Sequence, residues 1–394
     1  MQQVLKNIRV LDFGRFIAAP WCSALLADMG ADVIRIEKRE GGEDRWVQPV
    51  ATGGEGATFL QCNRNKRSMT LDTTTKEGGE IARKLITNSD VVIANMPDAA
   101  MRANGLDYES LRAVKPEIIL ASATAFGHGG PYSDKVGFDG IGQVMSGGVY
   151  RSGTPEQPMR CVVPYIDFST AQNLVIGTMM ALYHRQQTGQ GQWVQTALLP
   201  TALVMTNAMI IEQAILQSNK SAVGNRGTAV APCDLFKFKD GWILVQVAGQ
   251  PMFKRWCRMV EKQEWFQDAR FGSDDQRAEN ADVLNNCMAT WCLERTMAEA
   301  ITELEAARIP AGPLYSPQQA LDDSHVQAMG FFKPIEYPGL KQPAPVIETP
   351  FHLSAAPGTI RTRAPLLGEH TDAIITELGY SAAELAELRK NNII

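Results

Sequence analysis

The sequence predicts an α/β fold, in which a doubly wound parallel sheet is followed by a smaller unit of different pattern. Short apolar, β-branched segments alternate with amphipathic helical segments through the first half of the chain, as in parallel sheets with helices on both faces. This alternation ends at the polar, glycine-containing segment 217–226. Hydrophobic residues make up 45% of the 394 residues and charged residues 21%, so a large buried core is expected.

The elements of the first half follow from the period of the apolar residues and from the breaks between them. Strands are expected at 8–13, 32–37, 91–95, 117–123 and 193–198. Helices are expected at 18–29, 76–87, 108–114, 168–183 and 201–216. Gly30 suits the C-cap of the first helix, because glycine readily adopts the left-handed conformation that ends many helices.

The chain after 217–226 has a different pattern, so a domain boundary is expected in that segment. Two strands and a series of helices are expected there, at 234–238, 242–248 and 252–306. Lys239-Asp240-Gly241 provides the turn between the two strands. From Pro310 the chain becomes proline-rich and irregular, and a helical tail is expected over 370–390.

Charge and composition exclude several classes of function. A net charge of −5 gives no general attraction to nucleic acid or to an anionic membrane, so neither is expected as a partner. The five histidines lack metal-ligand spacing and the seven cysteines form no Cys-x-x-Cys pair, so no metal site is expected. Scattered cysteines in odd number favour reduced thiols and a cytoplasmic protein. No signal peptide is expected, and the longest apolar stretches fall short of a membrane span.

The common nucleotide-binding and hydrolase motifs are absent. The first strand–turn–helix unit contains only Gly14, too few glycines for the close approach of a dinucleotide pyrophosphate. The sequence has no P-loop and no Gly-x-Ser-x-Gly elbow, which argues against a P-loop nucleotidase and an ordinary serine hydrolase. These patterns leave the function open.

A longer pattern is formed by a dozen short motifs that follow one another along nearly the whole chain. The early motifs are Val10-Leu11-Asp12-Phe13, Pro20, 25–37, Asn65-Lys66-Arg67-Ser68, Leu71-Asp72, Ala94-Asn95-Met96-Pro97, Ala121-Ser122 and Phe126-Gly127. The later motifs are Gly137-Phe138-Asp139, Gln143, Ser146-Gly147, Asp167, 188–192, Gly224-Asn225-Arg226, Ala231-Pro232, Asp240-Gly241-Trp242, 309–313 and 367–371. In this order they resemble the class III CoA-transferases, such as formyl-CoA, carnitine and bile-acid CoA-transferases, with α-methylacyl-CoA racemase as a relative.

The resemblance implies a fold, substrates and an assembly. A Rossmann-like large domain would include 1–224 and the C-terminal return 321–394, with a small α+β domain at 225–320. The substrates would be an acyl-CoA and a carboxylic acid, with coenzyme A as substrate and no tightly bound cofactor. Two copies of the chain would form an interlocked homodimer.

Asp167 is the candidate catalytic residue. Its position before an apolar helical run favours an N-cap, which contributes about 1 kcal/mol to helix stability. The resemblance implies that the same carboxylate attacks the acyl-CoA thioester, giving a mixed anhydride and then an aspartyl-CoA thioester. The two roles are compatible, because a helix N-terminus favours the anionic carboxylate that a nucleophile requires.

Two alternatives to a transferase stay open. The racemase relatives move an α-proton with a histidine and an aspartate, and this chain has Phe138 where their motif has the histidine. Because phenylalanine transfers no proton, the transferase is favoured. A non-catalytic acyl-CoA-binding protein is the third possibility. The segments 156–159 and 234–248 are more similar to carnitine CoA-transferase, which favours a larger or dicarboxylic acid and makes succinyl-CoA the first donor to test.

CoA-binding residues also follow from the resemblance. The matching positions are Arg15, Ala18, Lys38, Leu71, Thr73, Asn95, Met96, Ala100, Arg102 and Lys135. Lys38 stands where formyl-CoA transferase has arginine, so the charge is kept but a bidentate contact is lost. Two interpretations of Arg15 are equally favoured. In the first, Arg15 pairs with a second carboxylate of the substrate; in the second, its side chain is solvated or faces a phosphate.

Three further groups have structural interpretations. Arg64, Lys66 and Arg67 form a basic run, expected at a solvated surface more than at a phosphate. Met179 and Met180 follow helical spacing and are expected in the core. Trp46 is expected in the core, with the wall of an acyl pocket as the alternative.

Overall fold

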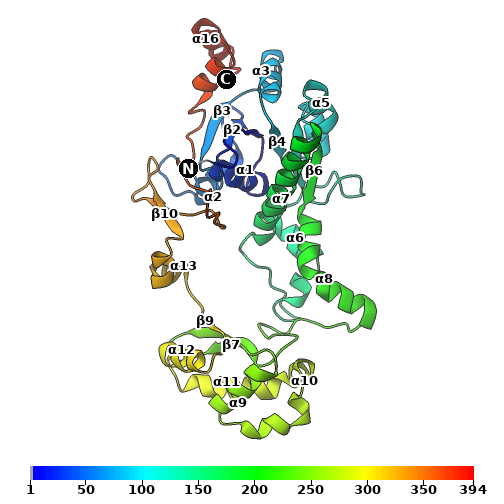
Figure 1. The fold of residues 1–394 in the computed structure, drawn as a ribbon, viewed down its shortest axis with the longest axis vertical. Coiled ribbons are helices and arrows are strands. Elements are labelled where there is room, and N and C mark those ends of the chain that lie inside the picture. Colours follow the sequence, from blue (N-terminus) through cyan, green and yellow to red (C-terminus); the bar gives the residue numbers. More distant parts are fainter. Residues whose placement is uncertain (1–2) are drawn as a thin grey trace. The chain divides into compact units, whose positions relative to one another are not determined.

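The computed structural model describes residues 3–394, which divide into two compact units (Figure 1). Unit 1 comprises the described part of Met1–Gly148, together with Cys161–Gln217 and Met329–Ile394. Unit 2 comprises Val149–Arg160 and Ser218–Ala328. The short segment Val149–Arg160, which the sequence did not assign to the small domain, belongs to unit 2 because the backbone N–H of Gly224 donates to the carbonyl of Gly153 at 2.6 Å.

Unit 1 contains a six-stranded parallel sheet. Its strands are β1 (Arg9–Asp12), β2 (Asp32–Glu37), β3 (Lys66–Thr70), β4 (Val91–Ala94), β5 (Ile119–Thr124) and β6 (Trp193–Ala197). Their spatial order is β3-β2-β1-β4-β5-β6, so the order reverses between β1 and β4. Leu11 of β1 lies opposite both Ile34 of β2 and Val92 of β4. The edge strand β3 was missed from the sequence, because Lys-Arg-Ser-Met-Thr has neither an apolar run nor strict alternation.

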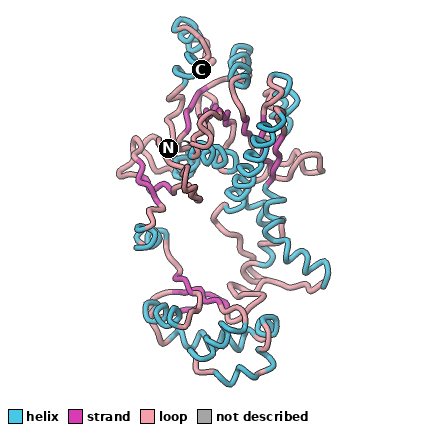
Figure 2. Tube along the Cα trace, in the orientation of Figure 1, coloured by secondary structure: helices cyan, strands magenta, loops and turns pink. Residues whose placement is uncertain are grey.

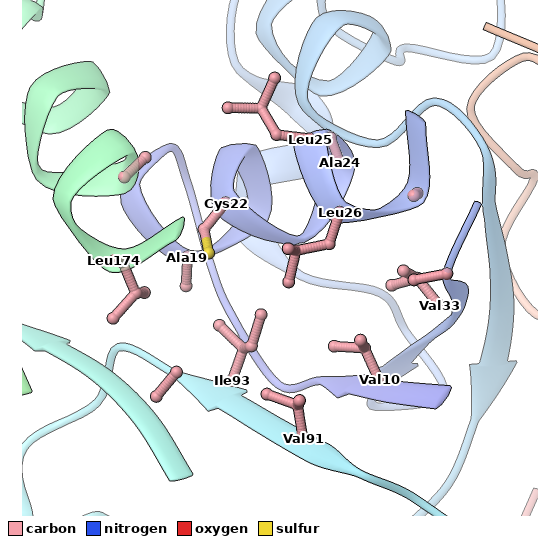
Figure 3. Packing of buried hydrophobic residues seen from close by; sticks show 14 of the residues in the cluster. Val10, Ala19, Cys22, Ala24, Leu25, Leu26, Val33, Val91, Ile93 and Leu174 are labelled. Atoms are coloured by element: carbon pink, nitrogen blue, oxygen red, sulfur yellow. The ribbon is translucent and has the colours of Figure 1, made fainter. Parts of the chain in front are cut away.

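Different helices cover the two faces of this sheet. One layer consists of α1 (Ala18–Asp28) and α7 (Tyr165–Thr188). Figure 3 shows Cys22 of α1 and Leu174 of α7 packed over Val10 and Ile93 of the sheet. The opposite layer consists of α3 (Lys76–Thr87), α5 (Tyr108–Val114), α15 (Thr371–Glu377) and α16 (Ala382–Lys390). Leu11, next to Val10 in β1, faces this second layer, as the two-residue period of a strand requires.

The other elements of unit 1 are shorter or lie at the margins of the sheet. They are η1 (Glu43–Trp46), α2 (Ala57–Cys62), α4 (Asp98–Ala103), α6 (Asp139–Met145), α8 (Leu198–Leu216), and the antiparallel hairpin β10 (Phe332–Ile335) and β11 (Ala344–Ile347). Trp46 is 43% exposed at the end of η1, so its expected place in the core is wrong.

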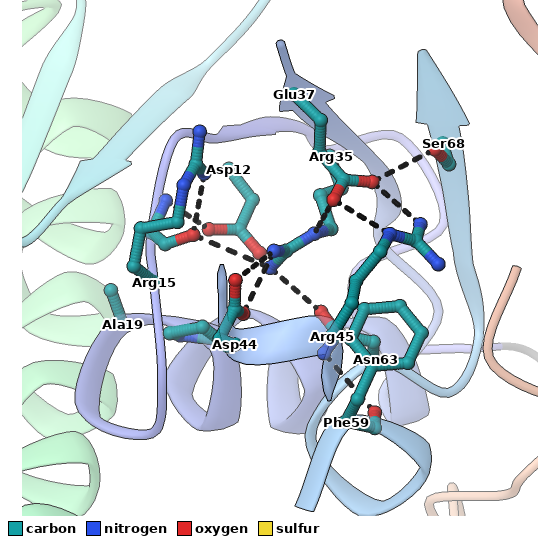
Figure 4. A network of polar contacts seen from close by, with 12 residues as sticks. Asp12, Arg15, Ala19, Arg35, Glu37, Asp44, Arg45, Phe59, Asn63 and Ser68 are labelled. Atoms are coloured by element: carbon teal, nitrogen blue, oxygen red, sulfur yellow. Dashed lines mark hydrogen bonds and ion pairs between the residues drawn. The ribbon is translucent and has the colours of Figure 1, made fainter. Parts of the chain in front are cut away.

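Buried ion pairs lie beneath the carboxyl ends of the central strands (Figure 4). Arg35 pairs with Asp44 at 2.8 Å, and Arg45 pairs with Glu37 at 2.6 Å. Lys66 is enclosed in the same region and binds the carboxylate of Asp12 at 2.7 Å. These side chains have little or no exposed surface, so the charges are compensated inside the protein rather than by water.

The basic run 64–67 therefore does not lie at a solvated surface, and that expectation is wrong. Arg64 is 1% exposed and pairs with Asp28 at the end of α1, at 2.7 Å. Lys66 is 2% exposed. Only Arg67 keeps partial exposure, with Asp32 and Glu377 as partners. The carboxylates that compensate Arg64 and Lys66 come from segments 36 and 54 residues away, which a local charge pattern does not reveal.

Helix α8 has an exposed apolar surface. Val204 and Ile215 are 76% and 75% exposed, and Met180 of the neighbouring α7 is also exposed, contrary to its expected place in the core. By length and composition alone α8 could cross a membrane, which corrects the expectation that every apolar stretch is too short. Because 22% of that stretch is buried, most of its apolar surface has no cover within the described chain.

Unit 2 has its own hydrophobic core, and Figure 2 shows its strands and helices. Its antiparallel sheet has the order β7 (Cys233–Lys237), β8 (Trp242–Gln246) and β9 (Ala311–Pro313). Its helices are η2 (Val149–Arg151), α9 (Gln250–Met259), η3 (Gln263–Gln267), η4 (Ala269–Phe271), α10 (Asp274–Glu279), α11 (Ala281–Leu293), α12 (Met297–Ala306), α13 (Pro317–Asp322) and α14 (Ser324–Ala328). Trp256 and Phe253 of α9 are fully buried against Ile243 and Val245 of β8.

Candidate active site

Asp167 lies in the first turn of α7, two residues after the helix begins. The expectation that it caps the helix is wrong, since Pro164 occupies the N-cap position without a side-chain bond. The cap is supplied by Asp139 at the start of α6. One Asp139 oxygen accepts hydrogen bonds from the backbone N–H of Ile166 at 2.7 Å and from that of Asp167 at 3.1 Å. These bonds satisfy helix N–H groups that otherwise have no partner inside α7.

The surroundings of Asp167 disfavour its ionised form. Burial first, and then the negative charge of Asp139, raise the pKa of Asp167 to about 7. Asp139 is itself buried and is held by Gln143, whose side-chain N–H donates to it. The side-chain Oε1 of Gln143 accepts a hydrogen bond from the backbone N–H of Cys161 at 3.0 Å, which ties the chain before α7 to α6.

Asp167 borders a cavity of about 260 Å³, here called the Asp167 cavity. Two cations, Arg15 and Lys135, also border it. The rest of the lining is mostly apolar or backbone and comprises Phe16, Ile17, Ala18, Asn95, Met96, Pro97, Ala123, Thr124, Ala125, Ser133, Val136, Gly137, Phe138 and Leu198. Phe138 rests edge-on against Phe16, with ring centroids 5.4 Å apart. A semi-buried carboxyl group, nearby cations and an apolar wall suit a short acyl group with a polar end.

A second cavity of about 450 Å³, here called the Lys38 cavity, shares Arg15 and Met96 with the first. It is lined by Phe13, Ile36, Glu37, Lys38, Arg39, Glu40, Leu71, Asp72, Thr73, Thr74, Asn104 and Leu106. Lys38 is half-exposed and pairs with Glu43 at 2.8 Å. The two cavities meet at Arg15, so an elongated ligand could extend from the Lys38 cavity toward Asp167.

The sheet topology explains why the cavities lie here. Ligands of open α/β sheets bind at the carboxyl ends of the strands, where the strand order reverses. Arg15 follows β1 and Asn95 follows β4, the two strands that flank this reversal. The Asn95 side chain accepts the backbone N–H of Arg15 at 2.8 Å and donates to its carbonyl at 2.7 Å. This reciprocal pair fixes the two turns against each other.

The structure brings most of the residues expected to bind CoA to these cavities. The Asp167 cavity is bordered by Arg15, Ala18, Asn95, Met96 and Lys135, and the Lys38 cavity by Arg15, Lys38, Leu71, Thr73 and Met96. Ala100 and Arg102 lie on α4 and line neither cavity. Within residues 3–394 no group of three or more metal-ligating side chains is assembled.

Asp139 and Gln143 are the functional residues whose role the sequence did not reveal. Both occur in the quoted motifs, but their partners Ile166, Asp167 and Cys161 are 18 to 28 residues away. A signal was present, because an aspartate at the start of a helix and a glutamine four residues later lie on one helix face. The pattern does not indicate that this face points to the start of another helix.

Comparison with known proteins agrees with the sequence motifs and with the fold. The family model for CoA-transferase family III matches residues 5–371. Among curated relatives, succinate–glutarate CoA-transferase of Agrobacterium fabrum is 33% identical over 382 residues, covering 95% of each chain. Succinyl-CoA–D-citramalate CoA-transferase of Chloroflexus aurantiacus is 31% identical and covers 99% of this chain and 98% of its own.

Solved structures give the same result. A CAIB/BAIF family protein from Brucella suis superposes with a TM-score of 0.84 at 31% identity, covering 96% of this chain and 100% of the other. The protein Rv3272 from Mycobacterium tuberculosis superposes with a TM-score of 0.83 at 25% identity, covering 95% and 99%. The chain belongs to CoA-transferase family III.

Proposed function

We propose that this protein transfers coenzyme A from an acyl-CoA donor to a carboxylic acid acceptor, with Asp167 as the nucleophile. The observation that carries the proposal is a semi-buried aspartate at the border of a mostly apolar cavity, which shares Arg15 and Met96 with a second cavity. A carboxylate with a raised pKa is a stronger base once ionised, and therefore a better nucleophile than a solvated one.

The proposed reaction needs no group beyond the two substrates and Asp167. The carboxylate attacks the thioester carbonyl, the C–S bond breaks, and the CoA thiolate leaves an aspartyl mixed anhydride. The thiolate then attacks the aspartyl carbonyl, which releases the donor acid and gives an aspartyl-CoA thioester. The acceptor carboxylate repeats the two steps in reverse, so that the acceptor leaves as its CoA thioester and Asp167 is regenerated. Because a carboxylate is a weak nucleophile, positioning must supply much of the acceleration.

The proposed donor is succinyl-CoA and the proposed acceptor a dicarboxylic acid. Curated relatives are named for succinate–glutarate, D-citramalate and L-malate transfer, each with two carboxylates on the acid. A formyl-CoA:oxalate CoA-transferase from Rhodopseudomonas palustris is 27% identical, a weaker match than these three. Arg15, which borders the Asp167 cavity, provides a complementary charge.

For CoA itself we propose that the nucleotide end occupies the Lys38 cavity and the thioester reaches Asp167. Lys38 and Thr73 would contact the nucleotide, and Asn95, Met96 and Ala18 would border the pantetheine arm. Arg102 and Ala100 on α4 would contact CoA only outside the two cavities. We place the protein in a reducing, cytoplasmic compartment, consistent with seven free cysteines.

We also propose that the protein works as a homodimer, interlocked as in the family it belongs to. The exposed apolar surface of α8, which includes Val204, Ile211 and Ile215, supports an interface with a second copy. Two curated relatives from Chloroflexus aurantiacus are named as alpha and beta subunits, so related chains also assemble with non-identical partners.

The test is a transfer assay in which CoA esters are separated after mixing the protein with succinyl-CoA and glutarate, malate, formate or oxalate. The proposal predicts glutaryl-CoA or malyl-CoA and free succinate. It also predicts that Asp167→Asn lowers the transfer rate at least a thousandfold, with a melting temperature no lower than that of the wild type. Exchange of the α-proton of the acyl-CoA without transfer would instead support the racemase alternative. CoA binding without either reaction would support a binding protein.

A further inference from the structure

We propose that Arg15 binds the distal carboxylate of a dicarboxylic acyl group or acceptor, and so selects dicarboxylic over monocarboxylic substrates. This inference rests on the proposed function and names its substrate class. It assigns to Arg15 a role on the acid rather than on CoA.

The buried network contains one cation more than it has carboxylates (Figure 4). Four cations, Arg15, Arg35, Arg45 and Lys66, lie among three carboxylates, Asp12, Glu37 and Asp44. Each carboxylate is already paired with one of the last three cations. Arg15 forms no ion pair with any residue in 3–394, and it is only partly exposed.

An unpaired guanidinium in this environment is unfavourable. Burial first, and then the positive charge of Arg35, lower the pKa of Arg15 below its usual value. An anion bound next to Arg15 would remove this imbalance, because it would supply the missing negative charge in a region of low polarity. The network is thus complementary to a negatively charged ligand.

The guanidinium of Arg15 is held in one orientation by one of its nitrogens. Its Nη1 atom is anchored on backbone carbonyls, with Gly14 at 2.9 Å, Phe13 at 3.3 Å and Ile36 at 3.4 Å. Nε and Nη2 donate to no acceptor in residues 3–394, and neither is sealed from solvent. These two nitrogens form the edge that binds a carboxylate through two parallel hydrogen bonds. The backbone of Arg15 is fixed by Asn95, so the edge is held in place before a ligand arrives.

Arg15 is also suitably placed relative to Asp167. Arg15 and Asp167 border the same small cavity, whose other lining is mostly apolar, so a short chain between them would place one carboxyl carbon at Asp167 and an anionic end at Arg15. Lys135, the other cation there, is exposed and its ammonium lies 3.9 Å from the ring centroid of Tyr132. An exposed cation discriminates weakly, because water screens it. The same edge of Arg15 could bind a phosphate oxygen of CoA, and the experiment separates the two sources.

The test compares substrates that differ only at the distal end. Succinyl-CoA is compared with butyryl-CoA as donor, and glutarate with pentanoate as acceptor, for the wild type, Arg15→Gln and Arg15→Lys. Lys135→Gln is the matched control at the same cavity. Calorimetric titration with CoA and melting temperatures report nucleotide binding and folding.

The proposal predicts that Arg15→Gln lowers kcat/KM for succinyl-CoA and glutarate by about tenfold to a hundredfold, with little change for butyryl-CoA and pentanoate. Arg15→Lys should give an intermediate loss, since it keeps the charge but not the two parallel bonds. Lys135→Gln should affect the two donors by the same factor. CoA affinity should be unchanged in Arg15→Gln.

Three results would overturn the role of Arg15. If Arg15→Gln lowers kcat/KM equally for succinyl-CoA and butyryl-CoA and also weakens CoA binding, then Arg15 binds a phosphate of CoA. No loss in Arg15→Gln, or a wild type that uses butyryl-CoA as well as succinyl-CoA, would remove the selectivity while leaving the transferase intact. If the wild type transfers CoA between none of these pairs, the proposed function fails. In that case, calorimetric titration with glutarate tests whether Arg15 binds a carboxylate. Equal glutarate affinity in the wild type and in Arg15→Gln would contradict that role.

Discussion

The carboxylate of Asp139 lies 3.1 Å from the backbone nitrogen of Asp167, and this contact places a second negative charge beside the Asp167 side chain. Asp139 takes the N–H groups that would otherwise stabilise a negative charge at the start of α7, and it adds a negative charge of its own. A helix N-terminus favours a nearby anion by about 0.3–1 kcal/mol. Burial and Asp139 act in the opposite direction and prevail, since the pKa of Asp167 rises from 3.8 to about 7.

Transfer activity should therefore depend on pH in the neutral range. As the proposed nucleophile, Asp167 would attack only when ionised, so kcat/KM for the donor should fall about tenfold per unit below pH 7 and level off above it. In Asp139→Asn one negative charge is lost while an oxygen still accepts a helix N–H, so the acid limb should move down by up to about one pH unit. The measurement is the pH dependence of initial rates from pH 5 to 9.

The control for this profile is Asp372→Asn on α15, which should match the wild type. A flat wild-type profile between pH 5 and 8 would contradict a raised pKa at Asp167. An unchanged acid limb in Asp139→Asn would show that Asp139 acts only as a cap.

The ionisation of Asp167 should also lower protein stability. Its pKa is higher in the folded protein than in the unfolded chain, so the folded state binds the proton more tightly and loses stability as pH rises from about 4 to about 7. Asp167→Asn removes this penalty and should be more stable than the wild type by about 1–4 kcal/mol at pH 8, with a smaller gain at pH 5. Urea unfolding at the two pH values measures the difference. A variant that is no more stable at pH 8 would refute the prediction.

The pair of Lys66 and Asp12 should contribute strongly to stability only as a pair. Lys66→Met leaves the fully buried Asp12 carboxylate without its cation and should cost about 3–5 kcal/mol. Asp12→Asn combined with Lys66→Met should be less damaging than the sum of the single changes, because no lone charge is left behind. Lys38→Met is the control, since its exposed pair with Glu43 is worth about 0–1 kcal/mol. The free energy of unfolding is measured by urea denaturation. An equal loss of stability in Lys38→Met and Lys66→Met would refute the prediction.

The apolar surface of α8 should be an interface between copies of the chain. Val204→Glu with Ile215→Glu places two charges on this surface and should shift the protein from dimer to monomer. Ala386→Glu, on exposed α16, should leave the dimer intact. Size-exclusion chromatography with light scattering measures the mass. A wild-type monomer that binds phosphatidylcholine vesicles would instead assign α8 to a membrane.

Much of the sheet followed from the sequence because its central strands are continuous apolar runs. Val91–Ala94 and Ile119–Thr124 are buried on both faces, so their composition predicts them without tertiary information. β3 was missed for the opposite reason, because Lys66 and Ser68 point to buried polar partners, Asp12 and Glu37, that are distant in sequence. The basic run 64–67 was assigned to a solvated surface for the same reason, because the carboxylates that pair with Arg64 and Lys66 are also distant in sequence.

The candidate site, too, was predicted from the sequence only in part. Asp167 and Asn95 belong to the short motifs quoted above, and Arg15 is one of the positions that the resemblance assigns to CoA binding. The structure places all three at one cavity. The cap from Asp139 and the unpaired charge of Arg15 depend on residues brought together by the fold. Such relationships between distant segments leave no periodic or local signal in a single sequence.

The most direct test of the central claim is to trap the covalent intermediate on Asp167. The protein is mixed with succinyl-CoA, quenched with hydroxylamine, and examined by intact and peptide mass spectrometry. The account predicts a hydroxamate on Asp167 that is absent in Asp167→Asn and in a sample without succinyl-CoA. A wild type that converts succinyl-CoA and glutarate to glutaryl-CoA while Asp167 stays unmodified, or that gives the adduct on another residue, would contradict it.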